Sequence, residues 1–292
     1  MSTIKSKKIN RSIVYKTIYK YSEISKKQIM SKLNMSAPTI TYYLNELLNE
    51  NLVIYGDLLK STGGRKAQSF SCNYDAYFSI GIDITPSRLG GVLVNLAGDI
   101  KDTLTLNIPF LDTPNYYCKV AEVIKALCST QHIKKNILGV GVSVPAIVDK
   151  SGRTIHFAPL IHASNLIQSL EESINLPVKL FNDANAGGLA ELWYLKDTTN
   201  MVYLSLSNTV GSAILLNNHL YYGDNALSGE VGHMMLHPNG KLCYCGKRGC
   251  VDPYCSTFAL TSGKCDLDTF FKKLQSGEQK IEERWSAYLD NI

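Results

Sequence analysis

The chain has 292 residues, 45% of them hydrophobic and 19% charged, which is the composition of an ordinary folded protein with room for two or three domains. No run of about 18 apolar residues occurs, which excludes a membrane-spanning helix, and the basic N-terminus lacks the apolar region of a secretory signal. We therefore expect a cytoplasmic protein with reduced cysteines.

The charge is distributed unevenly along the chain. Residues 1–70 carry twelve Lys and Arg against four Asp and Glu, a balance of +8, whereas the whole chain is +5 and the remainder is therefore −3. A basic N-terminal segment ahead of a mildly acidic body is typical of a nucleic-acid-binding domain joined to a domain of another kind.

The first 50 residues predict three short helices. Residues 1–8 are expected to form a mobile basic arm, and apolar residues at helical spacing predict the first helix from Ile9 to about Tyr21. Ser25 is expected to cap a second helix and Ser36 a third, with a turn at Asn34 between them. The third helix buries Ile40, Leu44, Leu47 and Leu48. This arrangement is similar to a helix-turn-helix.

Two strands, Leu52–Leu58 and about Ala67–Asn73, follow and predict the wing of a winged helix. In such a domain the third helix enters the major groove, where its outward residues meet the bases, and a Gly-Gly-Arg wing inserts a guanidinium into the minor groove. The predicted DNA contacts are Ser36, Thr39, Thr41, Tyr42, Asn45, Arg65 and Lys66. A winged helix that binds protein instead of DNA is the alternative.

From Tyr77 onward the pattern changes to strands and helices in alternation. Strands are predicted at Phe78–Ile84, Leu89–Asn95, Ile100–Ile108, Ile137–Val144 and Val178–Phe181, with helices at about Asn115–Gln131 and Asn165–Asn175. Met201–Leu206, Gly211–Leu216 and Leu220–Tyr222 predict a second meander, and three further helices are expected at about 256–262, 267–275 and 278–290.

Asn182 and Asp183 stand where a predicted strand ends and a helix begins. Asn and Asp cap helices well, so their role could be purely structural. Acceptor groups at the carboxyl end of such a strand also face the ligand crevice of an α/β sheet, so they are equally candidates for ligand contacts. Both interpretations can hold together.

A dense motif occupies Gly229 to Cys250. Cys243, Cys245 and Cys250 form a C-x-C-x4-C cluster, with His233 ten residues upstream, and Gly246 and Gly249 allow the backbone to fold back. Thiolate and imidazole are the ligands of structural zinc, and four of them close a tetrahedral site. The alternative is three free thiols in a loop.

This stretch, G-E-x-G-H followed by C-x-C-G-x-x-G-C, resembles the signature of the ROK family of repressors and sugar kinases. The resemblance implies an actin-like, ribonuclease-H-like fold, and it assigns His233 to the metal and to the edge of a sugar pocket. It assigns Glu230 to sugar, where a solvated loop acid is the alternative, and it adds Asn182 and Asp183 as sugar contacts. Asp252 stands where the family usually has a glutamate and is a weaker sugar candidate. ROK regulators carry a comparable Gly-Gly-Arg wing.

The kinase pattern of this family is degraded here. Thr85-Pro86-Ser87-Arg88 replaces a glycine-threonine phosphate turn, and Ser207-Asn208-Thr209-Val210 replaces a glycine-rich one. The chain is also expected to lack the family's C-terminal portion, including an adenosine-binding segment. We therefore expect no kinase activity.

We predict a winged helix over residues 1–73 and a ROK sugar-binding domain over 74–292, with one structural zinc. The expected function is that of a sugar-responsive transcriptional regulator, which we expect to be a repressor, that binds operator DNA and a sugar or sugar phosphate. A ROK sugar kinase and a degenerate constitutive DNA binder are the alternatives. The last helix carries an apolar stripe, which we expect to remain uncovered and to support a homodimer or higher oligomer: Ile281, Trp285, Tyr288, Leu289 and Ile292.

Overall fold

The computed structural model describes residues 2–59, 66–129, 136–158, 160–161, 166–195 and 198–292. Two compact units are distinguished: one comprises Met1–Ile80, Val92–Thr103 and Cys128–Gly139, and the other comprises Gly81–Gly91, Leu104–Leu127 and Val140–Ile292. The domain division at residues 73 and 74 stays a prediction. Among the residues described, no helix is long and apolar enough to cross a membrane.

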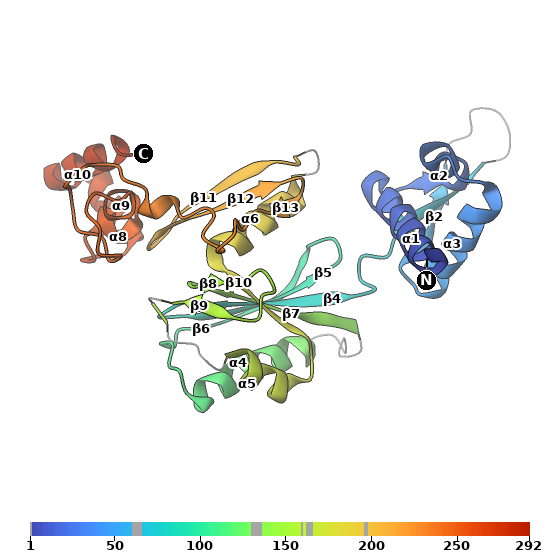
Figure 1. Ribbon diagram of the computed structural model, residues 1–292, viewed down its shortest axis with the longest axis horizontal. Helices are drawn as coiled ribbons and strands as arrows, with labels where there is room; N and C mark the ends of the chain where they lie inside the picture. Colours follow the sequence, from blue (N-terminus) through green and yellow to red (C-terminus); the bar gives the residue numbers. More distant parts are fainter. Residues whose placement is uncertain (1, 60–65, 130–135, 159, 162–165, 196–197) are drawn as a thin grey trace. The chain divides into compact units, whose positions relative to one another are not determined.

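The N-terminal elements form a small helical domain with a three-stranded sheet (Figure 1). They are α1 (Ser2–Tyr21), β1 (Ile24–Ser25), α2 (Lys26–Leu33), α3 (Ala37–Asn49), β2 (Val53–Leu58) and β3 (Gln68–Cys72), and the strand order is β1-β3-β2. The predicted apolar face of α3 packs into a core shared with α1, α2 and the sheet. Tyr43, which periodicity did not select, is buried there as well.

Local capping explains where α2 and α3 begin. The Ser25 hydroxyl oxygen accepts from the backbone N–H of Gln28, and the Gln28 side-chain oxygen accepts from the backbone N–H of Ser25. The two hydrogen bonds form a complete capping box. Asn34 ends α2 in the left-handed region at φ 51°, and the Ser36 hydroxyl accepts from Thr39 to start α3. The predicted turn between the helices is therefore confirmed.

Two features of this domain differ from expectation. Residues 2–8 belong to α1 and are not a separate mobile arm, because the Lys-rich sequence from Ser2 onward continues the helix without a breaker. The strand β1 pairs antiparallel with β3, with Ile24 opposite Phe70. A two-residue strand has no periodicity that would predict it.

A five-stranded sheet with the order β10-β7-β4-β5-β6 forms the middle of the chain. Its strands confirm the predicted ones: β4 (Phe78–Ile84), β5 (Leu89–Asn95), β6 (Ile100–Leu106), β7 (Ile137–Val144) and β10 (Val178–Asn182). Figure 1 draws α4 (Pro114–Ser129) and α5 (Leu166–Ile174) along one face of this sheet. Gly91 of β5 permits the close approach of α4, because a Cβ there would lie 2.6 Å from Val123.

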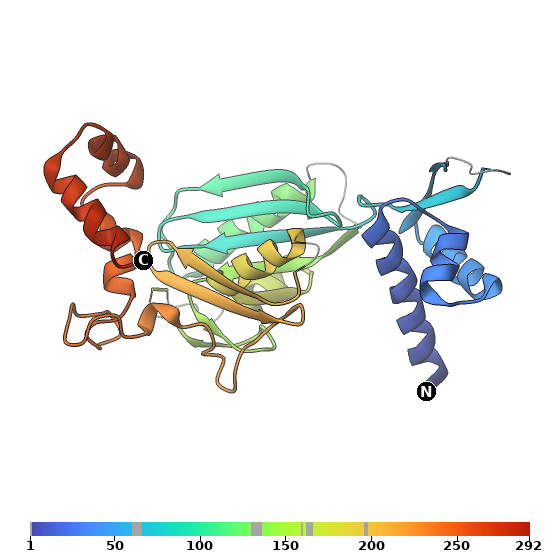
Figure 2. The same ribbon diagram turned by 90° about the horizontal axis from the view of Figure 1, so that it is seen from above.

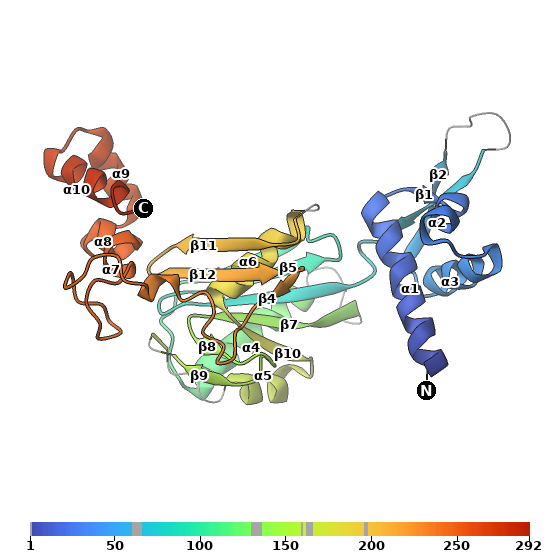
Figure 3. The same cartoon turned by 45° about the horizontal axis from the view of Figure 1, so that its top comes forward.

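A second, three-stranded sheet follows in the order β11-β12-β13, made by β11 (Met201–Leu206), β12 (Val210–Leu216) and β13 (His219–Leu220). The helix α6 (Asp183–Tyr194) packs against β11 and β12 (Figure 3). Gly187 and Gly188 make this contact possible, since a Cβ on either would come within 3 Å of a sheet side chain. The short hairpin of β8 (Ile147–Val148) and β9 (Ile155–Phe157) was not predicted.

The chain ends in the helices α7 (Asp252–Cys255), α8 (Thr257–Thr261), α9 (Leu267–Gln275) and α10 (Gln279–Leu289) (Figure 2). Their contacts bury most of the stripe that was expected to be uncovered. Ile281 and Tyr288 are buried with Phe270, and Trp285 packs against them. That expectation is wrong for these three residues, because α8 and α9 supply the apolar partners; Leu289 and Ile292 remain exposed.

Candidate functional site

The four predicted metal ligands lie together. One ligand atom from each of His233, Cys243, Cys245 and Cys250 falls within 4.8 Å of the other three. His233 Nδ1 is 3.5 Å from Cys243 Sγ, and Cys245 Sγ is 3.8 Å from Cys250 Sγ. These separations suit four ligands around one cation, and a set of three thiols and one imidazole is the donor chemistry that zinc selects.

The loop that carries the cysteines is shaped by its glycines. Gly246 has φ 86° and Gly249 has φ 83°, which side-chain-bearing residues rarely adopt. A Cβ on Gly249 would also lie 1.7 Å from the His237 carbonyl oxygen. Burial raises the pKa of the Cys243 thiol to about 12, so a cation must displace its proton to bind there. The predicted role of both glycines is confirmed.

The last helix is tied to this loop. His237, which is not one of the four ligands, contacts Asn291 Oδ1 through Nε2 at 2.6 Å. Tyr288 donates its hydroxyl to the Cys255 carbonyl oxygen at 2.8 Å, and the Cys255 thiol donates to the Asn291 carbonyl oxygen at 3.2 Å. The first of these hydrogen bonds reaches the loop and the other two reach Cys255 of α7; together we call them the loop clasp.

A cavity of about 430 Å³ lies beside the metal cluster, within the second unit. Its wall is made by the turn after β7, the start of α6, β12, and the segment from Leu227 through the cysteine loop. A volume of this order suits a small-molecule ligand. Four of the five predicted sugar residues line it: Asn182, Asp183, Glu230 and His233. Cys245 lines it too, so the metal cluster and the cavity share a wall.

Asn182 is engaged on both sides of its amide. Its Oδ1 accepts from the Asn185 backbone N–H at 3.1 Å, which caps α6, and its Nδ2 donates to the Ala146 carbonyl oxygen at 3.2 Å. The capping role that the sequence suggested is therefore confirmed. The residue also borders the cavity, so its role as a ligand contact stays a prediction beside the confirmed cap.

The two carboxylates of the cavity have perturbed pKa values while remaining accessible to solvent in the open cavity. Burial against the surrounding protein raises the pKa of Asp183, and the charge of Asp83 raises it further. Burial also raises the pKa of Glu230; His233 opposes that shift and Asp183 adds to it. Elevated pKa values of this kind are typical of ligand-binding carboxylates, although structural acids show them too.

Asp252 has a different position from the one that the resemblance implied. It is 6% exposed, does not belong to the cavity wall, and accepts from the Val210 backbone N–H at 2.6 Å. Burial raises its pKa, and the Val210 hydrogen bond opposes that rise. The geometry therefore favours a structural role for Asp252, which holds the start of β12 against the metal loop.

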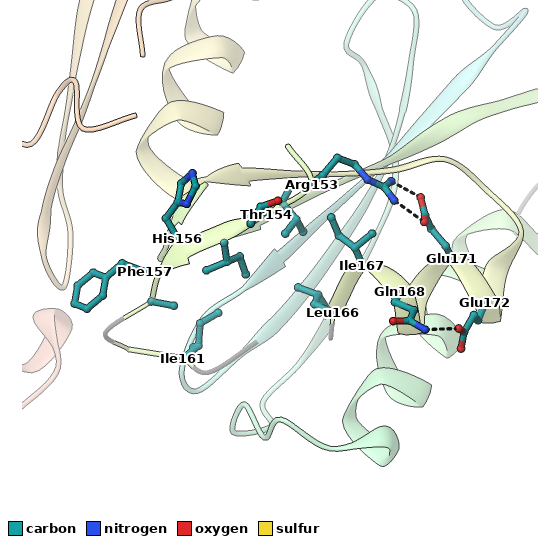
Figure 4. A pocket seen from close by; sticks show the side chains of 13 residues that line it. Arg153, Thr154, His156, Phe157, Ile161, Leu166, Ile167, Gln168, Glu171 and Glu172 are labelled. Carbon is teal, nitrogen blue, oxygen red and sulfur yellow. Dashed lines mark hydrogen bonds and ion pairs between the residues drawn. The ribbon is translucent and has the colours of Figure 1, made fainter. Parts of the chain in front are cut away.

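A second groove, of about 730 Å³, is lined by β9 and the residues around it, by α5 and by Leu180 of β10 (Figure 4). Its floor is apolar, and at one end Arg153 joins the hairpin to α5 through two hydrogen bonds to Glu171, at 2.5 and 2.9 Å. Phe157 lines both this groove and the cavity. No residue of this groove was predicted from the sequence as a site residue.

The two turns that would hold phosphates in a kinase are occupied by internal contacts. Arg88 Nη2 is 2.9 Å from Asp83 Oδ2, and the Arg88 backbone closes a turn onto Thr85. In the second turn the Asn208 side chain accepts from Thr257 at 3.3 Å.

The predicted DNA-contacting residues that the structure describes lie at the start of α3 and along it, with Lys66 just before β3. Ser36, Tyr42 and Asn45 are exposed, and Thr39 and Thr41 are partly exposed. Thr41 donates to the Ala37 carbonyl oxygen and Ser36 shares a hydrogen bond with Thr39, so these hydroxyls also serve the helix. Lys66 is exposed, whereas Arg65 lies outside the described residues. Lys7 of α1 lies over the Tyr42 ring, 5.8 Å from its centroid.

Comparison with known proteins gives two family matches and several similar chains. Residues 79–292 match the ROK family, and residues 9–54 match a winged helix-turn-helix DNA-binding family. A xylose repressor of Bacillus spizizenii is 32% identical over 283 residues, which cover 94% of this chain and 70% of that protein.

Two solved structures are similar as well. A ROK family transcriptional regulator, described as a homologue of the E. coli MLC protein, superposes with a TM-score of 0.72 at 23% identity, covering 93% of this chain and 68% of the other; this likeness shows the fold. A ROK family glucokinase from Streptomyces griseus, solved with glucose and AMPPNP, has a TM-score of 0.54 at 28% identity, covering 63% of this chain and 59% of the other.

Proposed function

The chain belongs to the ROK family and carries a winged helix-turn-helix ahead of its ROK region, and from this we propose that it is a sugar-responsive repressor that binds operator DNA. Its similarity to a named xylose repressor over 94% of its length supports a regulator of carbohydrate genes. Such a protein acts where the DNA is, in the cytoplasm.

One observation carries the sensing half of the proposal. Asn182, Asp183, Glu230 and His233 come from segments up to 51 positions apart, and all of them line the same cavity of about 430 Å³. Carboxylate and amide oxygens accept hydrogen bonds from hydroxyl groups, which is what a sugar offers. We propose that this cavity holds the effector, and xylose is the first sugar to test.

We propose zinc as the resident metal of the His-Cys cluster. Three thiols and one imidazole make a closed set that favours a structural over a catalytic role. When bound, the ion fixes the loop that carries Tyr244, Cys245 and Lys247 on the cavity wall. These residues would then meet a ligand in a preorganised position.

We also propose that the chain does not act as a kinase. Phosphoryl transfer needs phosphates, metal and nucleophile held in one place. At the first turn Arg88 pairs with Asp83, so this carboxylate is not free to hold the metal that accompanies ATP. Pro86 removes a backbone N–H from the same turn, so the turn has fewer donors for a phosphate. The similarity to a glucokinase supports a shared fold and a shared ancestry of the cavity.

Control of DNA binding follows from differential affinity. An effector that binds one arrangement of the protein better than another shifts the population toward it. Winged helices of this class read two half-sites as dimers, so we propose a homodimer or higher oligomer on operator DNA. The apolar stripe of α10 is no longer an argument for this, because α8 and α9 cover most of it.

The experiment combines melting and DNA binding. Purified protein is melted against a panel of sugars and sugar phosphates, and any ligand that stabilises it is added to an operator gel shift. A ligand at a hundred times its Kd stabilises by about 2.7 kcal/mol, and it should release the DNA.

Asp183→Asn and Glu230→Gln are the matched variants. Both should lose the ligand-induced shift while DNA affinity without ligand stays near that of wild type. Wild-type protein that binds operator DNA but responds to no sugar would favour the constitutive binder, and phosphorylation of a sugar by ATP would favour the kinase.

A further inference from the structure

We propose that Tyr254 and Asn291 are positioning residues of the metal site. Neither is a ligand, but both hold the segment 237–241, and this segment holds the backbone beside the ligand Cys250. In this way the two residues set how slowly the cysteine loop gives up its cation. The inference rests on the proposed zinc site, and it is carried by a continuous series of hydrogen bonds from α7 and from the residues after α10 to the loop.

The residue before Cys250 is held at both polar groups of its backbone. The carbonyl oxygen of Gly249 accepts from the N–H groups of Leu236 and His237, at 2.7 and 3.1 Å. The N–H of Gly249 donates to the carbonyl oxygen of Lys241 at 2.8 Å. Because Gly249 directly precedes Cys250, a displacement of residues 236–241 also displaces a ligand.

Tyr254 of α7 holds both ends of the segment 237–241. Its hydroxyl oxygen accepts from the Lys241 backbone N–H at 2.7 Å, and the Lys241 ammonium lies 4.6 Å from the centroid of its ring. The His237 ring makes an edge contact with the same ring, with the two centroids 4.7 Å apart. Gly240 permits this approach, because a Cβ there would lie 2.1 Å from the Tyr254 hydroxyl oxygen.

Asn291 holds the side chain of His237. Asn291 Oδ1 lies 2.6 Å from His237 Nε2, and an amide oxygen can only accept, so the imidazole donates through Nε2. Asn291 Nδ2 donates to the Ala287 carbonyl oxygen of α10, and this second hydrogen bond orients the amide. The backbone of His237 therefore supports the loop, while Tyr254 and Asn291 fix its ring.

These contacts bear on the rate at which the cation is released. Release requires the ligands to move apart, and groups that hold the ligands in place raise the cost of that movement. A hydrogen bond that exists in the closed loop and is lost as the loop opens slows release by about fivefold. Removing the Tyr254 hydroxyl or the Asn291 amide should therefore speed the loss of metal while leaving all four ligands in the chain.

The test compares two matched variants of the full chain, each loaded with Zn²⁺ and mixed with an excess of a coloured zinc chelator. Tyr254→Phe and Tyr288→Phe each lose one hydroxyl and one hydrogen bond, of 2.7 and 2.8 Å, but Tyr288 bonds to the Cys255 carbonyl oxygen and not to the cysteine loop. We expect Tyr254→Phe to release zinc about fivefold faster than wild type, and Tyr288→Phe to stay within about twofold of it. Equal rates for the two variants would contradict the role of Tyr254.

A second pair of variants tests Asn291 independently of Tyr254. Asn291→Ala should also release zinc about fivefold faster, whereas Asn291→Asp keeps an acceptor for His237 Nε2 and should restore the wild-type rate. The absorption bands of the Co²⁺-loaded variants should match those of wild type, because no ligand is changed, and the melting temperature of each variant checks that it folds.

The outcomes separate this inference from the proposed metal site. Wild-type protein that takes up neither Zn²⁺ nor Co²⁺ would overturn the metal site, and this inference with it. Wild-type protein that holds the metal, while Tyr254→Phe and Asn291→Ala release it no faster than wild type does, would overturn this inference alone.

Discussion

Replacing Asp252 by alanine tests whether this residue supports the fold or contacts the sugar. The carboxylate is 6% exposed and accepts from the Val210 N–H at 2.6 Å. Hydrogen bonds to charged groups contribute about 1.5–3 kcal/mol, and a buried N–H left without a partner costs about 1–3 kcal/mol. Alanine also removes a buried charge whose cost shows in the raised pKa of Asp252, and this offsets part of the loss.

The net expectation for Asp252→Ala is a loss of about 2 kcal/mol in the free energy of unfolding. For the second compact unit this loss corresponds to a melting temperature lower by about 4–8 °C. Calorimetry measures the melting temperature, and urea unfolding measures the free energy of unfolding. The matched control is Asp252→Asn, whose oxygen can still accept from Val210. It should lose less than about 1 kcal/mol and bind the effector within about twofold of wild type.

Two results would refute this reasoning. If Asp252→Ala melted at the wild-type temperature, the hydrogen bond to Val210 would not stabilise the fold. If Asp252→Asn kept its melting temperature but bound the sugar more than about tenfold more weakly, Asp252 would contact the ligand directly, as the family resemblance had implied.

Further predictions concern the cysteine loop, the N-terminal domain, Asp183 and Trp285. Cys245→Ser should lower the metal content below one ion per chain by elemental analysis and weaken the sugar response, while the affinity for operator DNA stays unchanged; wild-type protein purified free of metal would contradict it. Deleting residues 1–72 should abolish operator binding, and Lys66→Ala should lower the salt slope of log K by about 0.9 if that side chain meets a phosphate. The folded state raises the pKa of Asp183, so the ionised carboxylate disfavours the fold above that pKa. Asp183→Asn should therefore have a larger free energy of unfolding than wild type at pH 7, and this difference should shrink as the pH falls through the raised pKa. A difference that stays constant from pH 7 to pH 4 would refute the prediction. Trp285→Ala should lower the melting temperature by loss of its contacts with Phe270 and Tyr288 without changing the sedimentation coefficient of the folded protein, and dissociation into smaller species would restore an interface role for this residue.

Sequence reasoning located the elements whose signals are local. The helix starts at Ser25 and Ser36 depend on side-chain caps within three residues, and the left-handed Asn34 lies between them, so spacing alone was sufficient. The strands Phe78–Ile84, Leu89–Asn95 and Ile137–Val144 are each seven or eight residues long, and each is a largely apolar segment in which buried and less buried side chains alternate. The strands of the hairpin at 147–157 have only two and three residues, which is too short to show such a pattern. They form because they pair with each other, and the sequence carries no local signal of that pairing.

The candidate site was predictable to the extent that its residues form motifs. The metal cluster and the Asn182-Asp183 pair were found because the ligands are close in sequence. The role of Asp252 could not be read in this way, since its partner Val210 is 42 positions away. Phe157 and Lys247 were missed for a related reason: no spacing rule links them to Asp183, and only the fold brings them to one cavity.

The loop clasp has a consequence for the order of events during synthesis. All four metal ligands have been made once Cys250 is added, whereas Asn291, the partner of His237, comes 41 residues later. At about 5–20 residues per second, the ribosome needs about 2–8 s to cover that interval. The proposed ligand set is therefore complete in the nascent chain before Asn291 is made, and we expect an ion bound there to precede the closing of the loop by the residues at the end of α10.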